Sequence, residues 1–224
     1  YEGTELDMTM DPEAGPFGNP NRVRPLSWKI DSVSYSWERA ISTYNTAFSY
    51  IAQLRNYLPN EIGGIAWFGV DDTYTSCYFP IYCSVTQISL PFATGDINHY
   101  SRESAWWAFN FAANYANTRY GDIVVDIIKE QQELENLFVA QQDSIENIAI
   151  ALDDNSRIEF LTRYSDAMGK LVHSKWVSLG DRLITKYNDG YIKDDQGRIK
   201  TVGYPKEWLE LIINHDAEKY KIAN

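Results

Sequence analysis

The spacing of apolar residues changes once along the chain, close to Gly95, and this change limits the folds that the chain can adopt. Between residues 28 and 90, β-branched and aromatic residues recur in short runs separated by turn formers, which is typical of four or five β-strands. From residue 101 onward, apolar residues recur every three or four positions, which is typical of amphipathic helices. Strands followed by helices indicate an α+β fold, with a β-rich part over 1–100 and a helical part over 101–224.

The first 26 residues contain four prolines, so neither a helix nor a central strand is expected to run through them. We expect an extended segment that docks on the rest of the chain through Phe17, Leu26 and Trp28. The residues that follow are strand-like, and the β-branched and aromatic content of 41–54 predicts one of these strands. Arg39 therefore falls within a strand region, where a lone guanidinium needs a carboxylate or a ligand as its partner.

Asp71 and Asp72 separate two strand-like runs, and Asp tolerates the backbone of a tight turn. The pattern predicts a hairpin over 62–83 with these two residues in its turn. An acid–base pair is the less favoured interpretation, because adjacent strand residues face opposite sides unless a turn intervenes. Cys77 and Cys83 lie in the second strand of this hairpin, and two buried thiols are favoured over a disulfide.

Three long helices are predicted in the second part of the chain. Ser101 is placed to cap a helix through SAWWAFNFAANYA, and a second helical pattern covers 123–152. Ser156 and Glu159 form a capping box for a third helix that ends at Gly190, and its length suggests a hairpin with the second.

The remaining residues predict a short β-hairpin over 191–202 and a last helix that begins at Pro205.

Composition and missing motifs exclude several classes of function. A net charge of -11 argues against a nucleic-acid partner, and no apolar run is long enough for a membrane span. The sequence contains no G-x-S-x-G, P-loop, H-E-x-x-H or G-x-G-x-x-G motif, and its three histidines are far apart. We therefore expect no metal and no cofactor.

The candidates for substrate binding are Arg39, Asp72, Trp107, Asn110 and Asn114. The last three are candidates because Asn110 and Asn114 share a helical face one turn after Trp107.

Four segments of the chain carry a specific resemblance. In order and spacing, DMTMDPEAGPFGNPNRVRPL, SWERAISTYNTAFSYIAQLRNYLP, IGGIAWFGVDDTYTSCYFPIYC and YSRESAWWAFNFAANYANTRYGDI resemble the later part of the bacterial dipeptidase and secernin family of N-terminal-nucleophile cysteine hydrolases. The resemblance implies the C-terminal part of a sandwich in which two stacked sheets lie between layers of helices. It also implies cleavage of dipeptides by a cysteine whose own α-amino group is the base.

Residue 1 is Tyr, and both cysteines fall well past the position at which the family places its nucleophile. We therefore expect a C-terminal portion that is inactive alone, with the missing N-terminal half of the same protein and a dipeptide as partners. Exposed sheet faces favour association, with a homo-oligomer as one form. Arg39 is expected to hold a substrate carboxylate or the developing oxyanion.

Two other interpretations remain open. Aromatic stacking platforms are also typical of a stand-alone peptide- or glycan-binding module, and an assembly domain without a pocket is the third possibility. The residues do not decide the compartment. The resemblance implies a bacterial protein, with the cell envelope or secretion favoured over the cytoplasm.

Overall fold

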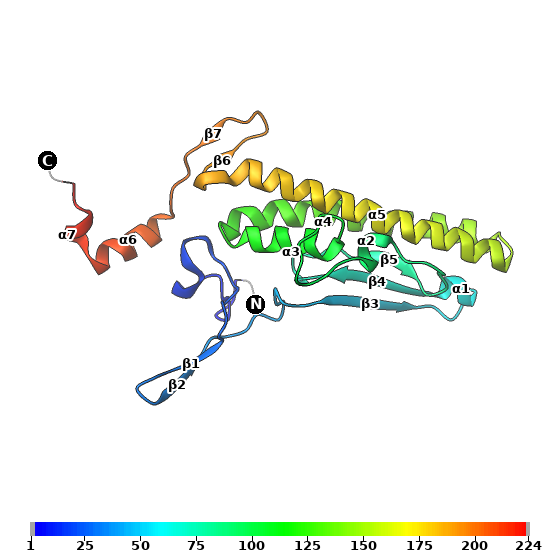
Figure 1. Ribbon diagram of the computed structural model, residues 1–224, viewed down its shortest axis with the longest axis horizontal. Coiled ribbons are helices and arrows are strands. Elements are labelled where there is room, and N and C mark those ends of the chain that lie inside the picture. Colours follow the sequence, from blue (N-terminus) through cyan, green and yellow to red (C-terminus); the bar gives the residue numbers. More distant parts are fainter. Residues whose placement is uncertain (1–2, 223–224) are drawn as a thin grey trace.

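The computed structural model describes residues 3–222 and confirms the α+β class. A three-stranded antiparallel sheet lies along one side of three helices, and two small hairpins and a C-terminal helical arm project from this body (Figure 1). The described residues thus form two layers, one of helices and one made by the three-stranded sheet. These two layers are half of the four-layer sandwich that the resemblance implies.

The central sheet has the order β3-β4-β5 and is formed by β3 (Phe48–Leu54), β4 (Gly64–Val70) and β5 (Phe79–Tyr82). The β4–β5 pair is the hairpin predicted over 62–83, with Ile65 opposite Tyr82 and Phe68 opposite Phe79. The strand predicted over 41–54 begins only at Phe48, because the residues before it form a loop. A short helix, α1 (Asn60–Gly63), joins β3 to β4.

Three helices cover the sheet: α3 (Ala105–Ala116), α4 (Tyr120–Ile150) and α5 (Asp154–Tyr187). The main core lies between them, where the indole of Trp176 stacks on the ring of Phe109 with centroids 4.3 Å apart. A second core, which includes Ile65, Tyr82 and Leu161, joins the sheet to the adjoining ends of α4 and α5. The predicted pairing of the second and third helices is confirmed.

Both predicted helix caps were wrong by three residues. Helix α3 begins after Ser104, while the Ser101 hydroxyl accepts a hydrogen bond from the backbone of Glu103. Helix α5 begins after Asp153, whose carboxylate accepts hydrogen bonds from the backbone N–H of Asn155 and Ser156. An aspartate is as effective an N-cap as a serine, so the earlier residue takes the capping position.

The proline-rich start forms a 3-10 turn, η1 (Pro12–Phe17), which is kinked at Gly15 and lies against α4. Phe17 docks as expected: its ring stacks on that of Tyr204, and the Arg119 guanidinium lies over it at 4.3 Å from the centroid. The hairpin of β1 (Ser27–Ile30) and β2 (Val33–Ser36) follows and projects from the body (Figure 1).

After α5, a 3-10 turn, η2 (Asn188–Gly190), leads into the hairpin of β6 (Ile192–Lys193) and β7 (Ile199–Lys200). The predicted last helix is α6 (Lys206–His215), with Pro205 as its N-cap residue, and the short α7 (Ala217–Tyr220) follows it. Within residues 3–222, none of the helices combines the length and the apolar composition that crossing a membrane requires.

Strand β3 is one of the two edge strands of the central sheet, and most of its side chains are exposed. Phe48, Tyr50 and Leu54 are 57%, 61% and 79% exposed, and the pairing with β4 places these three on one face. An exposed apolar edge strand is a surface on which another strand or sheet can pack. Within the described residues 3–222, each of these three side chains keeps more than half of its surface exposed.

Candidate functional site

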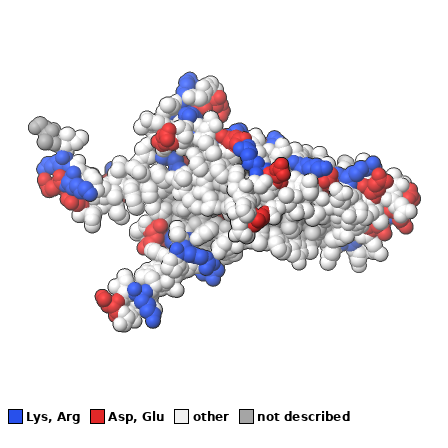
Figure 2. Space-filling model, viewed as in Figure 1, with Lys and Arg blue, Asp and Glu red and all other residues white. Residues whose placement is uncertain are grey.

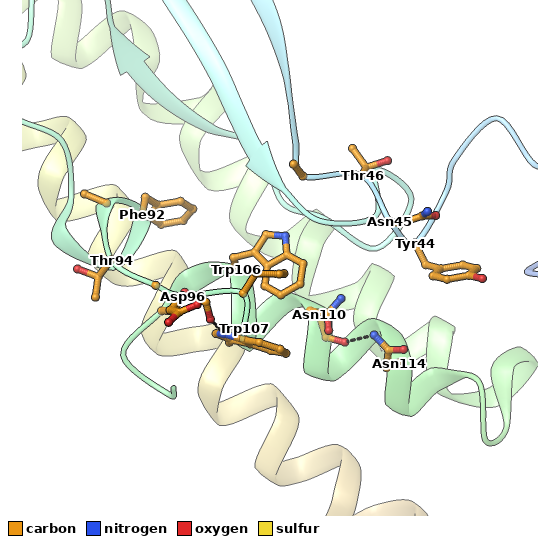
Figure 3. A pocket seen from close by; sticks show the side chains of 15 residues that line it. Tyr44, Asn45, Thr46, Phe92, Thr94, Asp96, Trp106, Trp107, Asn110 and Asn114 are labelled. Atoms are coloured by element: carbon orange, nitrogen blue, oxygen red, sulfur yellow. Dashed lines mark hydrogen bonds between the residues drawn. The ribbon is translucent and has the colours of Figure 1, made fainter. Parts of the chain in front are cut away.

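A pocket of about 720 Å³ lies between three segments: the loop before β3, the loop after α2 (Leu90–Ala93), and the exposed face of α3 (Figure 3). Its volume falls within the roughly 300–1,000 Å³ that is typical of small-molecule sites. Three of the five candidates from the sequence, Trp107, Asn110 and Asn114, line it together. Sequence reasoning missed the other contributing side chains: Tyr44, Asn45, Thr46, Phe92, Thr94, Asp96, Ile97, Ser104 and Trp106.

Asn110 connects the pocket wall to the turn after β4. Its Nδ2 donates a hydrogen bond to Oδ1 of Asp71 at 3.0 Å, across 39 residues of sequence. Asp71 is only 1% exposed and adopts a left-handed backbone with φ 64°, which Asp tolerates better than most residues. Its N–H donates to the carbonyl of Ala47, a residue that also lines the pocket. The turn therefore lies directly behind the pocket wall.

The Asp71 carboxyl is electrostatically unusual. Burial raises its pKa from 3.8 to about 7, opposed by the hydrogen bonds from Asn110 and from the Asp72 backbone, while the charge of Asp72 raises it further. No described group hydrogen-bonds its Oδ2, which is buried. A carboxyl with this pKa exchanges its proton near neutral pH. Groups with strongly shifted pKa values occur often at functional sites, so Asp71 is of interest as a group near the pocket.

Asp72 has a different place. Its carboxylate accepts hydrogen bonds from the Ser42 hydroxyl and from the backbone N–H of Tyr74, and the residue is 3% exposed. The Ser42 hydroxyl also accepts from Thr73, so Asp72 holds the loop before β3 against the turn after β4. Asp72 is not among the residues that line the pocket. Its hydrogen bonds stabilise the predicted turn, which lies behind the pocket wall.

The two tryptophans form the aromatic wall. Nε1 of Trp107 donates to the carbonyl of Asp96 at 2.9 Å, and the rings of Trp106 and Trp107 meet edge to face with centroids 4.8 Å apart. Figure 3 shows both indoles on the same side of α3 as Asn110. Among the fifteen lining residues, Asp96 alone carries a charged side chain. Charged groups are also sparse in the middle of this face of the molecule (Figure 2).

A family model for peptidase family C69 matches residues 1–133, which is more than half of the chain. The chain belongs to peptidase family C69. This is the dipeptidase and secernin family of cysteine peptidases that the four sequence segments resemble. The match includes the pocket, the Asp71 turn and the central sheet, and it ends within α4. No curated protein sequence matches the chain.

Neither cysteine of this C69 chain lies at the pocket. Both are free, as expected, but only Cys77 is buried, and the prediction of two buried thiols was wrong for Cys83. Burial, followed by the charges of Glu135 and Glu130, raises the pKa of the Cys77 thiol well above its ordinary value. A nucleophilic cysteine needs a lowered pKa and access to substrate. Cys77 has neither, and Cys83 is not among the lining residues.

Arg39 lies outside the pocket, in the loop after β2 rather than in a strand, and it is exposed. It lines a neighbouring groove together with Arg22 and Arg24, and this groove and the pocket share Tyr44 and Asn45. The buried partner expected for a strand arginine is therefore not required, because water solvates the guanidinium. Within residues 3–222, no group of three or more His, Cys, Asp or Glu side chains is placed to hold a metal ion.

Proposed function

We propose that this chain supplies the substrate pocket of a C69 dipeptidase and that the cysteine nucleophile comes from a segment outside the 224 residues. Family membership supports the reaction class, and the observation that carries the assignment is the 720 Å³ pocket with its aromatic and amide lining. A pocket of this size admits a dipeptide. The chain alone is then expected to bind dipeptides without hydrolysing them.

The positions of the cysteines support a nucleophile from elsewhere. Cys77 is inaccessible and its pKa is raised, while Cys83 is exposed beside Gly64 at the far end of β4 from Asp71. The exposed apolar face of β3 supports a partner that packs against it, which we infer to be the N-terminal half of the same protein. Burying Phe48 and Leu54 against that half would give at most roughly 1.5–3 kcal/mol for each side chain, because both are already partly buried.

The test compares the 224-residue chain with the full-length protein in a dipeptide hydrolysis assay. We expect hydrolysis only by the full-length protein, with loss of activity after treatment with a thiol reagent. Full-length Cys77→Ser and Cys83→Ser variants should keep their activity and their sensitivity to the reagent, because neither residue is the nucleophile. Hydrolysis by the chain alone, or activity lost in either variant while the protein stays folded, would refute this assignment.

Arg39 is the residue proposed to bind the substrate carboxylate or the developing oxyanion. Its groove adjoins the pocket at Tyr44 and Asn45, so one dipeptide can extend from the pocket toward the guanidinium. Arg39→Met in the full-length enzyme should reduce kcat/KM by roughly 10²-fold or more. Arg163→Met is the matched control, because Arg163 is exposed on α5 and forms an ion pair with the exposed Glu159. Equal kinetics for the two variants would remove Arg39 from the site.

A further inference from the structure

The hairpin of β1 and β2 has one apolar face and one polar face. Trp28 pairs with Tyr35 and Ile30 pairs with Val33, and side chains that pair across antiparallel strands point to the same face. The ring of Trp37, two residues after Tyr35, lies against that of Trp28 with centroids 4.6 Å apart. We call the surface of these five side chains the hairpin face. The other face carries serines and Lys29.

The hairpin face is open to solvent. The hairpin projects from the body (Figure 1), and none of the residues in its two strands is buried. A two-stranded hairpin is only marginally stable in water, so a partner on its apolar face would stabilise it. At its base, Trp37 lines a groove whose charged residues are both cations, Arg24 and Arg39. The surface thus combines exposed apolar side chains with a positively charged border.

Helix α6 has the complementary character. Half of its ten residues are apolar, and they lie on one side of the helix, opposite Lys206, Glu210 and Asn214. None of its residues is buried, and it packs against the short α7. Glu207 is exposed one turn before Leu211 and therefore borders the apolar side. We call this apolar side the arm face; it is formed by Trp208, Leu209, Leu211, Ile212 and Ile213.

The start of the arm is fixed to the body. The Tyr204 ring stacks on that of Phe17 with centroids 5.6 Å apart, and Nη2 of Arg119 donates to the carbonyl of Gly203 at 3.2 Å. Helix α6 begins directly after these contacts, at Pro205, and leads away from the helices and the sheet (Figure 1). A helix of ten residues is marginal by itself. Its apolar side therefore favours a partner beyond its own body.

We propose that the arm face of one copy of this chain docks on the hairpin face of a second copy, and that the contact is reciprocal. Both elements project from the same end of the body and lie apart from each other in one chain (Figure 1). A two-fold axis beside this end would bring each arm to the other copy's hairpin. Glu207 at the border of the arm face complements Arg24 and Arg39 at the border of the hairpin face.

The exposed area is sufficient for a dimer. Ile30, Val33 and Tyr35 on the hairpin, and the two leucines and Ile213 on the arm, keep 44–57% of their surface exposed. Two reciprocal contacts would cover on the order of 700 Å² of each copy, close to the roughly 800 Å² of a standard interface. The polar side of α6 carries two carboxylates and one ammonium, whereas helices that bind membrane surfaces are rich in Lys and Arg. These charges favour a protein partner over a lipid surface.

The first test measures dimerisation of the 224-residue chain by sedimentation velocity. Leu211→Glu places a carboxylate on the arm face and Val33→Glu places one on the hairpin face, and each should weaken dimerisation at least about tenfold. Asn214→Glu and Ser34→Glu are the matched controls, because they add the same charge to the opposite faces of the same elements. A wild-type chain that is monomeric at about 1 mM, or equal effects of face and control variants, would overturn the proposal.

Mixing the two face variants tests which surfaces meet. Leu211→Glu alone has no intact arm and Val33→Glu alone has no intact hairpin face, so neither should dimerise. A mixture contains one intact pair, the arm of the Val33→Glu copy and the hairpin of the Leu211→Glu copy, and should form heterodimers. Contacts of arm with arm or of hairpin with hairpin predict no such rescue. A mixture that behaves as the sum of its components overturns the proposal.

A measurement without variants identifies the copy to which each arm binds. Unlabelled and ¹⁵N-labelled chains are mixed and treated with an amine-reactive cross-linker, and mass spectrometry follows the peptides of Lys29 and Lys206. We expect cross-links that join a labelled to an unlabelled peptide. Cross-links confined to single copies would show that the arm folds onto its own hairpin, which contradicts the proposal.

The same measurements on the full-length protein separate a second copy from the N-terminal half as the partner. We expect a dimer that Leu211→Glu weakens and Asn214→Glu leaves unchanged. A full-length monomer in which Lys206 cross-links to the N-terminal half would overturn the proposal. Neither result depends on the proposed dipeptidase function, because none of these measurements uses hydrolysis.

Discussion

Replacing Asp71 with Asn should remove a pH dependence from the stability of this chain. The folded-state pKa of about 7 lies above the value of 3.8 for an unfolded chain, so the folded state keeps a proton that the unfolded state has released between these values. Stability therefore falls as pH rises through this window. At about 1.4 kcal/mol per pKa unit, the ionised carboxyl costs on the order of 4 kcal/mol above pH 7.

The variant isolates this cost. Asn tolerates the left-handed backbone at position 71, and its side-chain oxygen can still accept the hydrogen bond from Asn110. Any loss of packing is the same at every pH, so the informative quantity is the change in the stability difference with pH. The same pKa shift predicts a change in the difference between the two unfolding free energies. From pH 5 to pH 8, the stability of Asp71→Asn should rise by about 2.5 kcal/mol relative to that of the wild-type chain.

Urea denaturation at the two pH values measures this difference, with Asp143→Asn on the exposed surface of α4 as the control. The control should follow the wild-type chain at both pH values. A stability difference between Asp71→Asn and the wild type that is equal at pH 5 and pH 8 would refute a carboxyl that titrates near neutrality. The reasoning about burial and the missing partner of Oδ2 would then fail with it.

Three further predictions concern the packing around the site. Glu146→Gln should destabilise the chain by roughly 3–5 kcal/mol, because it leaves the guanidinium of Arg55 buried without its counterion, whereas Glu159→Gln in the exposed pair with Arg163 should cost less than about 1 kcal/mol; urea denaturation distinguishes them. Gly169→Ala should cost roughly 1–3 kcal/mol, since the new Cβ would lie 2.5 Å from Cβ of Ser89; an unchanged melting temperature would argue against this close contact of α5. A maleimide reagent should label Cys83 in the folded chain and Cys77 only after unfolding, as mass spectrometry can follow; rapid labelling of both would contradict the buried position of Cys77.

Local patterns predicted the elements better than their ends. The 3.6-residue period located α3, α4 and α5, and the alternation around Asp71 and Asp72 located the β4–β5 hairpin. The ends shifted where neighbouring residues compete for the same role, as Ser101 and Ser104 do before α3. Such competition depends on which arrangement packs better, and a sequence read locally does not contain that comparison.

For the candidate site too, local patterns identified some residues and missed those whose role depends on distant contacts. Trp107, Asn110 and Asn114 were found because they share one face of one helix, which is a local property. The role of Asp71 was missed, since its place in a tight turn was already a sufficient reason for an aspartate at this position. Only its contact with Asn110 places its carboxyl behind a pocket.

By itself, the sequence determined the α+β class, the order of strands and helices, and membership of family C69. Backbone hydrogen bonding and side-chain periodicity act over a few residues, and family motifs are short stretches of sequence, so all three are local properties. The tertiary structure decided which polar atoms are buried, which side chains line the pocket together, and that Arg39 is solvated in a loop rather than held in a strand. These depend on contacts between residues tens of positions apart, and burial in such contacts is what moves the pKa of Asp71 to near neutrality.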